Sequence, residues 1–328
     1  MINLCLFGAG RIGSIHADNV AKNKEVDIRY IVDAYQPAAQ ELAKRYNAKV
    51  VSVEEALADA EIHGVIIASS TNTHADLMEQ SARAGKAIFC EKPVDLSISR
   101  VKECLAVIEK AGVICSIGFN RRYDPQFNTL KQAIVTGQIG NLEMLTITSR
   151  DPSAPPIEYI KVSGGLFSDM MIHDFDVARW LLAEEPVEVF ATSSCLVDPA
   201  ISEAGDVDTA LVTLKTASGK LCQISNSRRS VYGYDQRIEA FGSGGMAQVG
   251  NQLESSLTLT GDTGSQTAKP QFFFLERYKA AYELELINFI ECIRDNKQPV
   301  ASGIDGLKSM VLAEAALQSS KTGKVVVL

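Results

Sequence analysis

A glycine-rich turn near the N-terminus constrains the fold of this chain more than any other feature. The apolar run at residues 2–7, INLCLF, is followed directly by Gly8-x-Gly10-x-x-Gly13 and then by a helical pattern. In this strand–turn–helix context, glycines allow a tight turn and let the backbone approach a pyrophosphate closely. The pyrophosphate can then bind the free N–H groups at the helix start. The pattern therefore predicts a dinucleotide site.

An acidic residue completes this pattern. A second apolar run, at residues 26–32, ends at Asp33, twenty residues beyond Gly13. A carboxylate at this place accepts hydrogen bonds from ribose hydroxyls and repels a 2′-phosphate. Ala34 follows it, with no nearby arginine to bind such a phosphate. We therefore expect NAD rather than NADP as the cofactor.

The first third of the chain alternates between short apolar runs and helical patterns. This alternation predicts βαβ units and a doubly wound parallel sheet, that is, a Rossmann domain over residues 1–120. The expected strands are residues 2–7, 26–32, 64–68, 87–90 and 113–117, and the expected helices include residues 37–46, 74–85 and 97–111.

The pattern changes beyond about residue 120, where partly alternating runs are separated by turn signals. Alternation favours an antiparallel sheet with one open or partner-covered face, so we expect a second α/β domain over residues 121–328. Its predicted strands are 141–149, 208–216, 220–227 and 236–241; helices are expected at 278–295 and 304–321, and an exposed loop at 255–270.

Composition excludes several classes of protein. The net charge of −8 argues against binding to nucleic acid or to an anionic membrane. No apolar run approaches the length of a membrane span, and no secretory signal precedes the first strand. The seven scattered cysteines without a C-x-x-C pair are typical of a reducing cytoplasm.

The segment GGLFSDMMIHDFDVARW, residues 164–180, predicts a mostly apolar helix with an unusual polar stripe. At about 100° per residue, Asp169, His173, Asp176 and Trp180 share one side, whereas Asp174 points elsewhere. The stripe could be a solvated face, a metal site or a pair of catalytic groups. Aspartate is a poor helix former, which weighs against a solvated face. Without a convincing third ligand, we expect no metal.

Two further motifs follow predicted strands of the first domain: Ser70-Thr-Asn-Thr-His74 and Glu91-Lys92-Pro93. Ligands bind at the carboxyl ends of strands in doubly wound sheets. Together with the glycine turn and the Asp169/His173 pair, these motifs resemble the glucose–fructose oxidoreductase/inositol dehydrogenase/MocA family, and most closely its inositol dehydrogenases. The resemblance covers essentially the whole chain, including GFNRRYD at 118–124, SRDP at 149–152 and YGYDQR at 232–237.

The resemblance implies a Rossmann domain followed by a domain with a large, open, mainly antiparallel sheet, and often a homotetramer formed through the exposed face of that sheet. It implies a cis Lys92–Pro93 bond, and catalytic roles for Lys92, Asp169 and His173. Further substrate contacts map onto Arg121, Asp151 and Tyr234. The predicted cofactor-binding residues are Gly8, Gly10, Arg11, Ile12, Asp33, Ser70, Thr71, Asn72, His74, Glu91 and Lys92.

The chemistry of these residue types agrees with oxidation of a secondary alcohol. Histidine, with an ordinary pKa of about 6.5, suits a base that removes the hydroxyl proton at neutral pH. Asp169 can orient the imidazole of His173 and pass the proton outward, and a cationic Lys92 stabilises alkoxide charge. A neutral Lys92 acting as the base is the alternative.

The leading functional hypothesis is NAD-dependent oxidation of a ring hydroxyl of a cyclic polyol, an inositol and foremost myo-inositol, to the 2-keto product. The alternatives are a dehydrogenase of a pyranose sugar or sugar derivative, an NAD-requiring glycosidase that recycles its cofactor, and an NAD-sensing regulator without catalysis.

Overall fold

The structure is a computed structural model that describes residues 1–328, and it divides into two compact units. The first unit comprises Met1–Tyr123 and Ala281–Met310, and the second comprises Asp124–Ala280 and Val311–Leu328. The predicted boundary at residue 120 lies close to the end of the first stretch. The predicted division into residues 1–120 and 121–328 does not include the return of residues 281–310 to the first unit.

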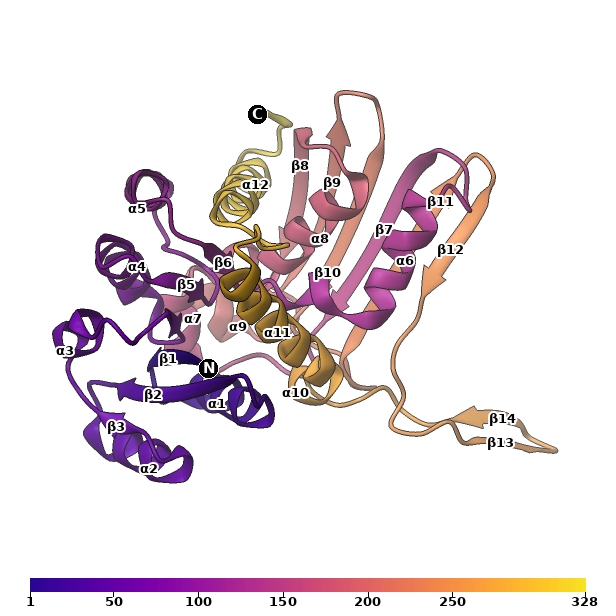
Figure 1. Ribbon diagram of the computed structural model, residues 1–328. Coiled ribbons are helices and arrows are strands. Elements are labelled where there is room, and N and C mark those ends of the chain that lie inside the picture. The colour runs from indigo at the N-terminus through magenta and orange to yellow at the C-terminus, as the bar shows by residue number, and fades with distance from the viewer. The chain divides into compact units, whose positions relative to one another are not determined.

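The first unit is built on a parallel sheet of six strands in the order β3-β2-β1-β4-β5-β6, as predicted for a doubly wound domain (Figure 1). The strands are β1 (Ile2–Phe7), β2 (Val26–Val32), β3 (Lys49–Val50), β4 (Gly64–Ile67), β5 (Ala87–Cys90) and β6 (Cys115–Ile117). Because β4 and β5 are buried on both faces, they read as continuous apolar runs rather than as alternating ones.

Helices connect and cover these strands. They are α1 (Arg11–Lys22), α2 (Gln36–Tyr46), α3 (Val53–Ala58), α4 (His74–Arg83), α5 (Ile98–Ala111) and α11 (Lys279–Asp295), with 3₁₀ turns at Thr71–Thr73 and Asn120–Tyr123. Leu286, Phe289 and Ile290 of α11 are buried in the same apolar core as α1, α2 and the strands. Each such side chain contributes about 1.5–3 kcal/mol by burial, which explains why this late segment belongs to the first unit.

The second unit contains a mixed sheet of seven strands in the order β12-β11-β7-β10-β9-β8-β15. The strands are β7 (Leu142–Arg150), β8 (Pro186–Ser194), β9 (Thr209–Thr216), β10 (Leu221–Ser227), β11 (Asp235–Gly242), β12 (Gly245–Val249) and β15 (Val326–Val327). Only the β7–β10 pair is parallel, so the sheet is mainly antiparallel as predicted. Burial alternates along β9 and β10, with one face packed and the other exposed.

The helices of the second unit are α6 (Pro125–Val135), α7 (Ile157–Ser163), α8 (Ile172–Leu182), α9 (Pro199–Glu203) and α10 (Phe274–Arg277). The last helix, α12 (Gly303–Thr322), begins in the first unit, and its residues from Val311 onward belong to the second. Asp124 caps α6 by accepting hydrogen bonds from the backbone N–H groups of Gln126 and Phe127. None of the helices is long and apolar enough to cross a lipid bilayer.

Two expectations are corrected. The segment expected as an exposed loop at 255–270 contains a hairpin, β13 (Thr258–Gly261) and β14 (Gly264–Thr267), which extends as an arm beyond the seven-stranded sheet (Figure 1). The helix expected over 164–180 begins with a π-helical turn, Leu166–Met170, and only then continues as α8. Gly164 and Gly165 both have positive φ, which prevents an α-helix from starting at residue 164.

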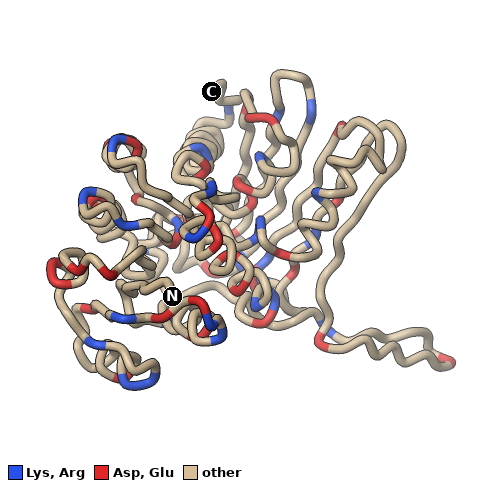
Figure 2. Tube along the Cα trace, viewed as in Figure 1, with Lys and Arg blue, Asp and Glu red and all other residues tan.

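Charged residues of both signs are scattered along the chain in each unit. Figure 2 shows Lys and Arg interspersed with Asp and Glu rather than gathered into one basic stretch. Ligand binding is therefore better analysed from the neighbours of individual charged residues than from a broad charged surface.

Candidate active site

The glycine turn between β1 and α1 has the shape that a dinucleotide requires. Gly8 has a φ of +103°, and a Cβ added there would lie 2.5 Å from the carbonyl oxygen of Ala68. A Cβ on Gly13 would lie 1.9 Å from the carbonyl oxygen of Gly8. At Gly10, by contrast, a Cβ would meet open space. The first and third glycines thus permit the tight turn, and the second leaves the start of α1 accessible to a ligand.

Asp33 stands at the end of β2, where its carboxylate joins two loops. Its Oδ2 accepts a hydrogen bond from the Ala9 N–H at 2.6 Å, and its Oδ1 accepts from the Tyr35 N–H at 2.7 Å. A carboxylate has about four acceptor sites, so each oxygen can still bind a hydroxyl group. The two backbone contacts hold Asp33 beside the glycine turn.

The loops after β4 and β5 carry the other predicted cofactor residues. His74, 2% exposed, places Nδ1 2.8 Å from the carbonyl oxygen of Pro93 and Nε2 3.0 Å from that of Ser69. Lys92 is half-buried directly after β5, and the Lys92–Pro93 bond is cis, as predicted. In the first unit the structure thus brings together, at the carboxyl ends of β1, β2, β4 and β5, the predicted residues Gly8, Gly10, Arg11, Ile12, Asp33, Ser70, Thr71, Asn72, His74, Glu91 and Lys92.

In the second unit, Asp169 lies within the π-helical turn. Its Oδ1 accepts a hydrogen bond from the Tyr159 hydroxyl at 3.0 Å, and its Oδ2 lies 4.0 Å from Nη2 of Arg228. Burial, followed by the negative charge of Asp169, raises the pKa of Tyr159 above its ordinary range, so its hydroxyl remains a donor. π-Helical turns occur frequently at functional sites.

Arg228 is a buried part of this cluster. Its side chain is 1% exposed, and Nη2 lies 3.6 Å from Oδ2 of Asp206. Oδ1 of Asp206 accepts from the Leu166 N–H at the start of the π-helical turn. A Cβ on Gly165 would lie 2.5 Å from Oδ1 of Asp206, so only glycine allows this approach. The buried guanidinium thus places a permanent charge between two carboxylates.

The polar stripe of the predicted helix is not a solvated face, because Asp176 is buried and Asp169, His173 and Trp180 are half-buried. Asp174 and Asp176 are both fully buried. Asp174 accepts a hydrogen bond from Asn226 at 3.0 Å, and Asp176 lies 3.8 Å from Arg179. The two residues therefore brace α8, while His173 on its first turn is only half-buried.

The remaining predicted substrate contacts lie in different elements. Arg121, 4% exposed, belongs to the 3₁₀ turn of the first unit. In the second unit, Asp151 directly follows β7 and is half-buried. Tyr234 is 7% exposed and packs edge-to-face on Tyr278, with ring centroids 6.0 Å apart.

Sequence reasoning missed Tyr159, Asp206 and the buried state of Arg228. Asp206 lies 37 residues beyond Asp169 in the sequence, and Arg228 lies 59 residues beyond it. A single sequence carries no periodicity or motif over such separations. Only the folding of the chain could reveal these partners.

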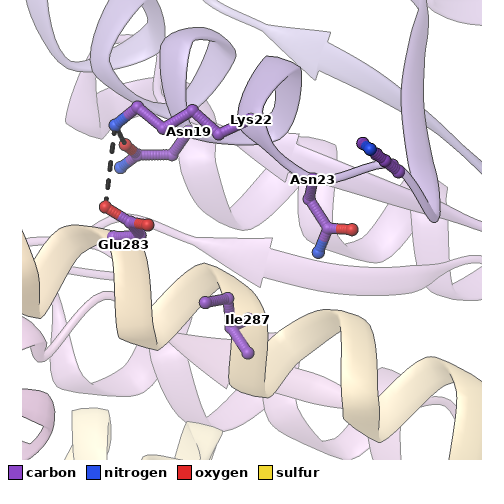
Figure 3. A pocket seen from close by; sticks show the side chains of 6 residues that line it. Asn19, Lys22, Asn23, Glu283 and Ile287 are labelled. Carbon is purple, nitrogen blue, oxygen red and sulfur yellow. Dashed lines mark hydrogen bonds and ion pairs between the residues drawn. The ribbon is translucent and has the colours of Figure 1, made fainter.

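An open hollow of about 210 Å³ occurs elsewhere in the first unit (Figure 3). It is lined by Asn19, Lys22, Asn23, Lys24, Glu283 and Ile287. Lys22 donates a hydrogen bond to Asn19 at 2.8 Å and lies 3.7 Å from Glu283, as the dashed lines in Figure 3 mark. The hollow contains none of the predicted site residues, so it is separate from the nucleotide site.

Both parts of the chain match known family domains. Residues 2–119 match the oxidoreductase family with an NAD-binding Rossmann fold, and residues 127–248 match the GFO/IDH/MocA C-terminal domain. An inositol 2-dehydrogenase of Rhizobium meliloti is 50% identical over 96% of this chain and 95% of its own length.

Solved structures of inositol dehydrogenases also match the chain over its whole length. A myo-inositol dehydrogenase of Corynebacterium glutamicum is 42% identical, with a TM-score of 0.95 over 100% of this chain and 99% of its own. A scyllo-inositol dehydrogenase of Lactobacillus casei, solved with NAD(H) and scyllo-inositol, is 27% identical with a TM-score of 0.92, over 100% of this chain and 99% of its own.

The first unit therefore is an NAD-binding Rossmann domain, and its residues fit that cofactor. The open backbone at Gly10 suits a pyrophosphate, and the carboxylate of Asp33 suits a ribose. Together with the matches across both units, these features show that the chain belongs to the GFO/IDH/MocA family of oxidoreductases.

Proposed function

We propose that this protein is an NAD-dependent dehydrogenase that oxidises a ring secondary hydroxyl of an inositol, with myo-inositol as substrate and 2-keto-myo-inositol as product. The structural observation that carries the proposal is the position of Lys92, directly after β5 at the same sheet edge as the glycine turn. The near-full-length likeness to inositol dehydrogenases supports the choice of substrate class.

In this proposal the protein's residues manage the proton of the hydroxyl group. The bound NAD would accept the hydride. His173 takes the hydroxyl proton, and Asp169 orients the imidazole and relays the proton. The Lys92 ammonium stabilises negative charge on the substrate oxygen. The contacts of Tyr159 and Arg228 with Asp169 support this division, because they hold the carboxylate in one place.

Arg121, Asp151 and Tyr234 are proposed to bind the hydroxyl groups of the substrate. A polyol needs many matched donors and acceptors, since each unmatched buried polar group costs about 1–3 kcal/mol. The guanidinium, the carboxylate and the phenol provide both kinds of group.

The test is a panel of inositol isomers and aldoses, assayed for NADH formation with the purified enzyme. We expect the highest kcat/KM for myo-inositol. A higher kcat/KM for scyllo-inositol would show that this isomer is the preferred substrate. A higher kcat/KM for a pyranose sugar would show that the enzyme is a sugar dehydrogenase. Cleavage of glycosides without net NADH would indicate the cofactor-recycling glycosidase, and NAD binding without any turnover would indicate a regulator.

We further propose that the exposed face of the seven-stranded sheet binds other copies of this chain in a homotetramer. Strand pairing places Met246, Phe241, Met144 and Leu221 in one row across this face, and each is at least 40% exposed. A contiguous exposed apolar row is typical of an interface. The row continues into the Lys215–Glu188 ion pair, at 3.0 Å.

The oligomeric state tests this surface. The Leu221→Lys variant is expected to lower the mass measured by light scattering, whereas Val162→Lys, on exposed α7, is expected to leave it unchanged. Equal masses for the variant and the parent would show that this face does not form the interface.

We also propose a cytoplasmic location, because all seven cysteines are free and six of them are buried.

A further inference from the structure

A second cluster of ionisable groups lies inside the first unit and takes no part in the proton transfer proposed above. It consists of His16 on α1, Glu91 directly after β5, and Glu285 on α11. Nε2 of His16 lies 2.8 Å from Oε1 of Glu91. One nitrogen or oxygen atom from each of the three side chains lies within 4.8 Å of the others.

The cluster is shielded from solvent. His16 and Glu285 are 0% exposed, and the Glu91 side chain is 13% exposed. The imidazole of His16 packs edge-to-face on the rings of Phe89 and Tyr282, at 4.9 and 6.1 Å between centroids. Two ionised carboxylates in such surroundings would repel each other and would each lose the stabilisation that water provides.

The carboxyl group of Glu285 receives no hydrogen bond that would stabilise a negative charge. Neither carboxyl oxygen of Glu285 has a hydrogen-bonding partner among the protein's atoms, and neither does Nδ1 of His16. A protonated Glu285 supplies one O–H donor, which an ionised Glu285 lacks. Burial, followed by the charge of Glu91, raises the pKa of Glu285 well above its ordinary range. Tyr123 also faces Glu285: burial raises the pKa of its hydroxyl, followed by the charge that an ionised Glu285 would carry.

We infer that Glu285 keeps its proton in the folded protein, beside the hydrogen-bonded pair of His16 and Glu91, so that the cluster fixes the backbone before Lys92. Glu285 is thus a positioning residue that acts through Glu91. The close packing of Gly118 agrees with this, because a Cβ there would lie 2.9 Å from Oε2 of Glu91. The effect on Lys92 rests on the function proposed above, whereas the buried proton does not.

The pH dependence of stability tests the buried proton. A carboxyl whose pKa is raised by folding contributes stability that is fully present below its unfolded pKa of about 4.5 and is lost as pH rises through the folded pKa. Gln at this position cannot titrate. We therefore expect the unfolding free energy of Glu285→Gln to rise relative to the parent as the pH increases above the unfolded pKa of about 4.5.

Glu283→Gln is the matched control, because Glu283 lies on the same helix with its side chain 42% exposed. Its stability difference from the parent should not grow with pH. The infrared C=O band of a protonated carboxyl should also be present in the parent at neutral pH and lost in Glu285→Gln. A pH-independent difference without this band would overturn the inference. So would one tightly bound metal ion per chain, measured by elemental analysis, because it would show that the cluster ligates a cation.

The positioning role needs a kinetic readout. Glu285→Gln keeps a donor and should retain kcat within about threefold, whereas Glu285→Leu removes the donor and should lower kcat roughly 10- to 100-fold, as expected for a misplaced reacting group. The pH profile of Glu285→Leu should keep its shape, and folded samples should still bind NAD. Equal kcat values for both variants would overturn the positioning role.

The two proposals can fail separately. If no inositol is oxidised, the kinetic comparison is made on whichever substrate the panel identifies, and the unfolding and infrared measurements are unaffected. A lost infrared band together with a normal kcat in Glu285→Leu would confirm the buried proton and refute its link to Lys92.

Discussion

Nδ1 of His74 lies 2.8 Å from the carbonyl oxygen of Pro93, and the opposite ring nitrogen faces the carbonyl oxygen of Ser69. One buried imidazole thereby joins the loop after β4 to the loop that carries Lys92. A neutral ring can donate to only one of these oxygens at a time, and an imidazolium can donate to both. In either form, His74 links two loops at the cofactor edge of the sheet.

Replacing His74 with Leu should weaken NAD binding, because the loops lose their common anchor. We expect the Kd for NADH, measured by fluorescence titration, to rise about tenfold, equivalent to about 1.4 kcal/mol. The exposed His63, replaced by Gln, is the matched control and should bind normally. Parent-like affinity in His74→Leu would show that the loops hold their positions without the ring.

Lys92→Ala should remove the stabilisation of charge on the substrate oxygen. We expect kcat to fall about 10²- to 10³-fold, the effect of losing one preorganised charge-stabilising donor. NAD binding should survive, as measured by the same titration. Lys110→Ala, at the exposed end of α5, should behave like the parent. A variant with near-normal kcat would refute the role of Lys92.

Asp33→Ala should narrow the preference for NAD over NADP, because it removes the charge that repels a 2′-phosphate. The expected change in the ratio of kcat/KM values is at least about tenfold. Because the change also removes the contacts with the Ala9 and Tyr35 N–H groups, Asp33→Asn serves as a comparison that keeps an acceptor. An unchanged ratio in both variants would exclude Asp33 as the residue that reads the ribose.

His173→Ala should alter the pH profile of kcat. In the parent, the rate should rise with pH as the imidazole loses its proton and becomes able to act as a base. The variant should be slower and should lack this limb. If the limb persists at the same pH, another group is the base, and the neutral form of Lys92 becomes the assignment to test next.

Asp208 is not one of the predicted site residues, and it allows a prediction about the stability of the fold. Burial tends to raise its pKa, but hydrogen bonds from the Leu196 and Val197 N–H groups, each 2.8 Å long, outweigh this and lower the pKa to about 2. Asp208→Asn should therefore cost about 1–3 kcal/mol at neutral pH. This stabilisation is present above the unfolded pKa of about 3.8 and is lost as pH falls through about 2.

Urea unfolding at about pH 7 and pH 3 tests how the difference in unfolding free energy between the parent and Asp208→Asn changes with pH. The difference between the parent and Asp208→Asn should be larger at the higher pH. Asp198→Asn, a cap with an exposed side chain on α9, should show a smaller difference at neutral pH. A difference between the parent and Asp208→Asn that grows toward acid pH would contradict the assigned cause.

The sequence by itself determined the Rossmann domain, the cofactor edge and the antiparallel sheet. Gly8, Gly13 and Asp33 are recognisable because their conformational and charge requirements are local, and strand alternation has a fixed period of two. For the same reason, β3 and β15, each two residues long, left no periodic signal.

Only the tertiary structure decided which groups surround the predicted catalytic residues. Tyr159, Asp206 and Arg228 come from separate segments and meet around Asp169. Glu285 comes close to Glu91 because residues 281–310 return to the first unit. Asp206 also accepts a hydrogen bond from the Leu166 N–H, where the π-helical turn begins. Such contacts arise from burial and charge pairing between distant segments, for which neither helical nor strand periodicity carries any signal.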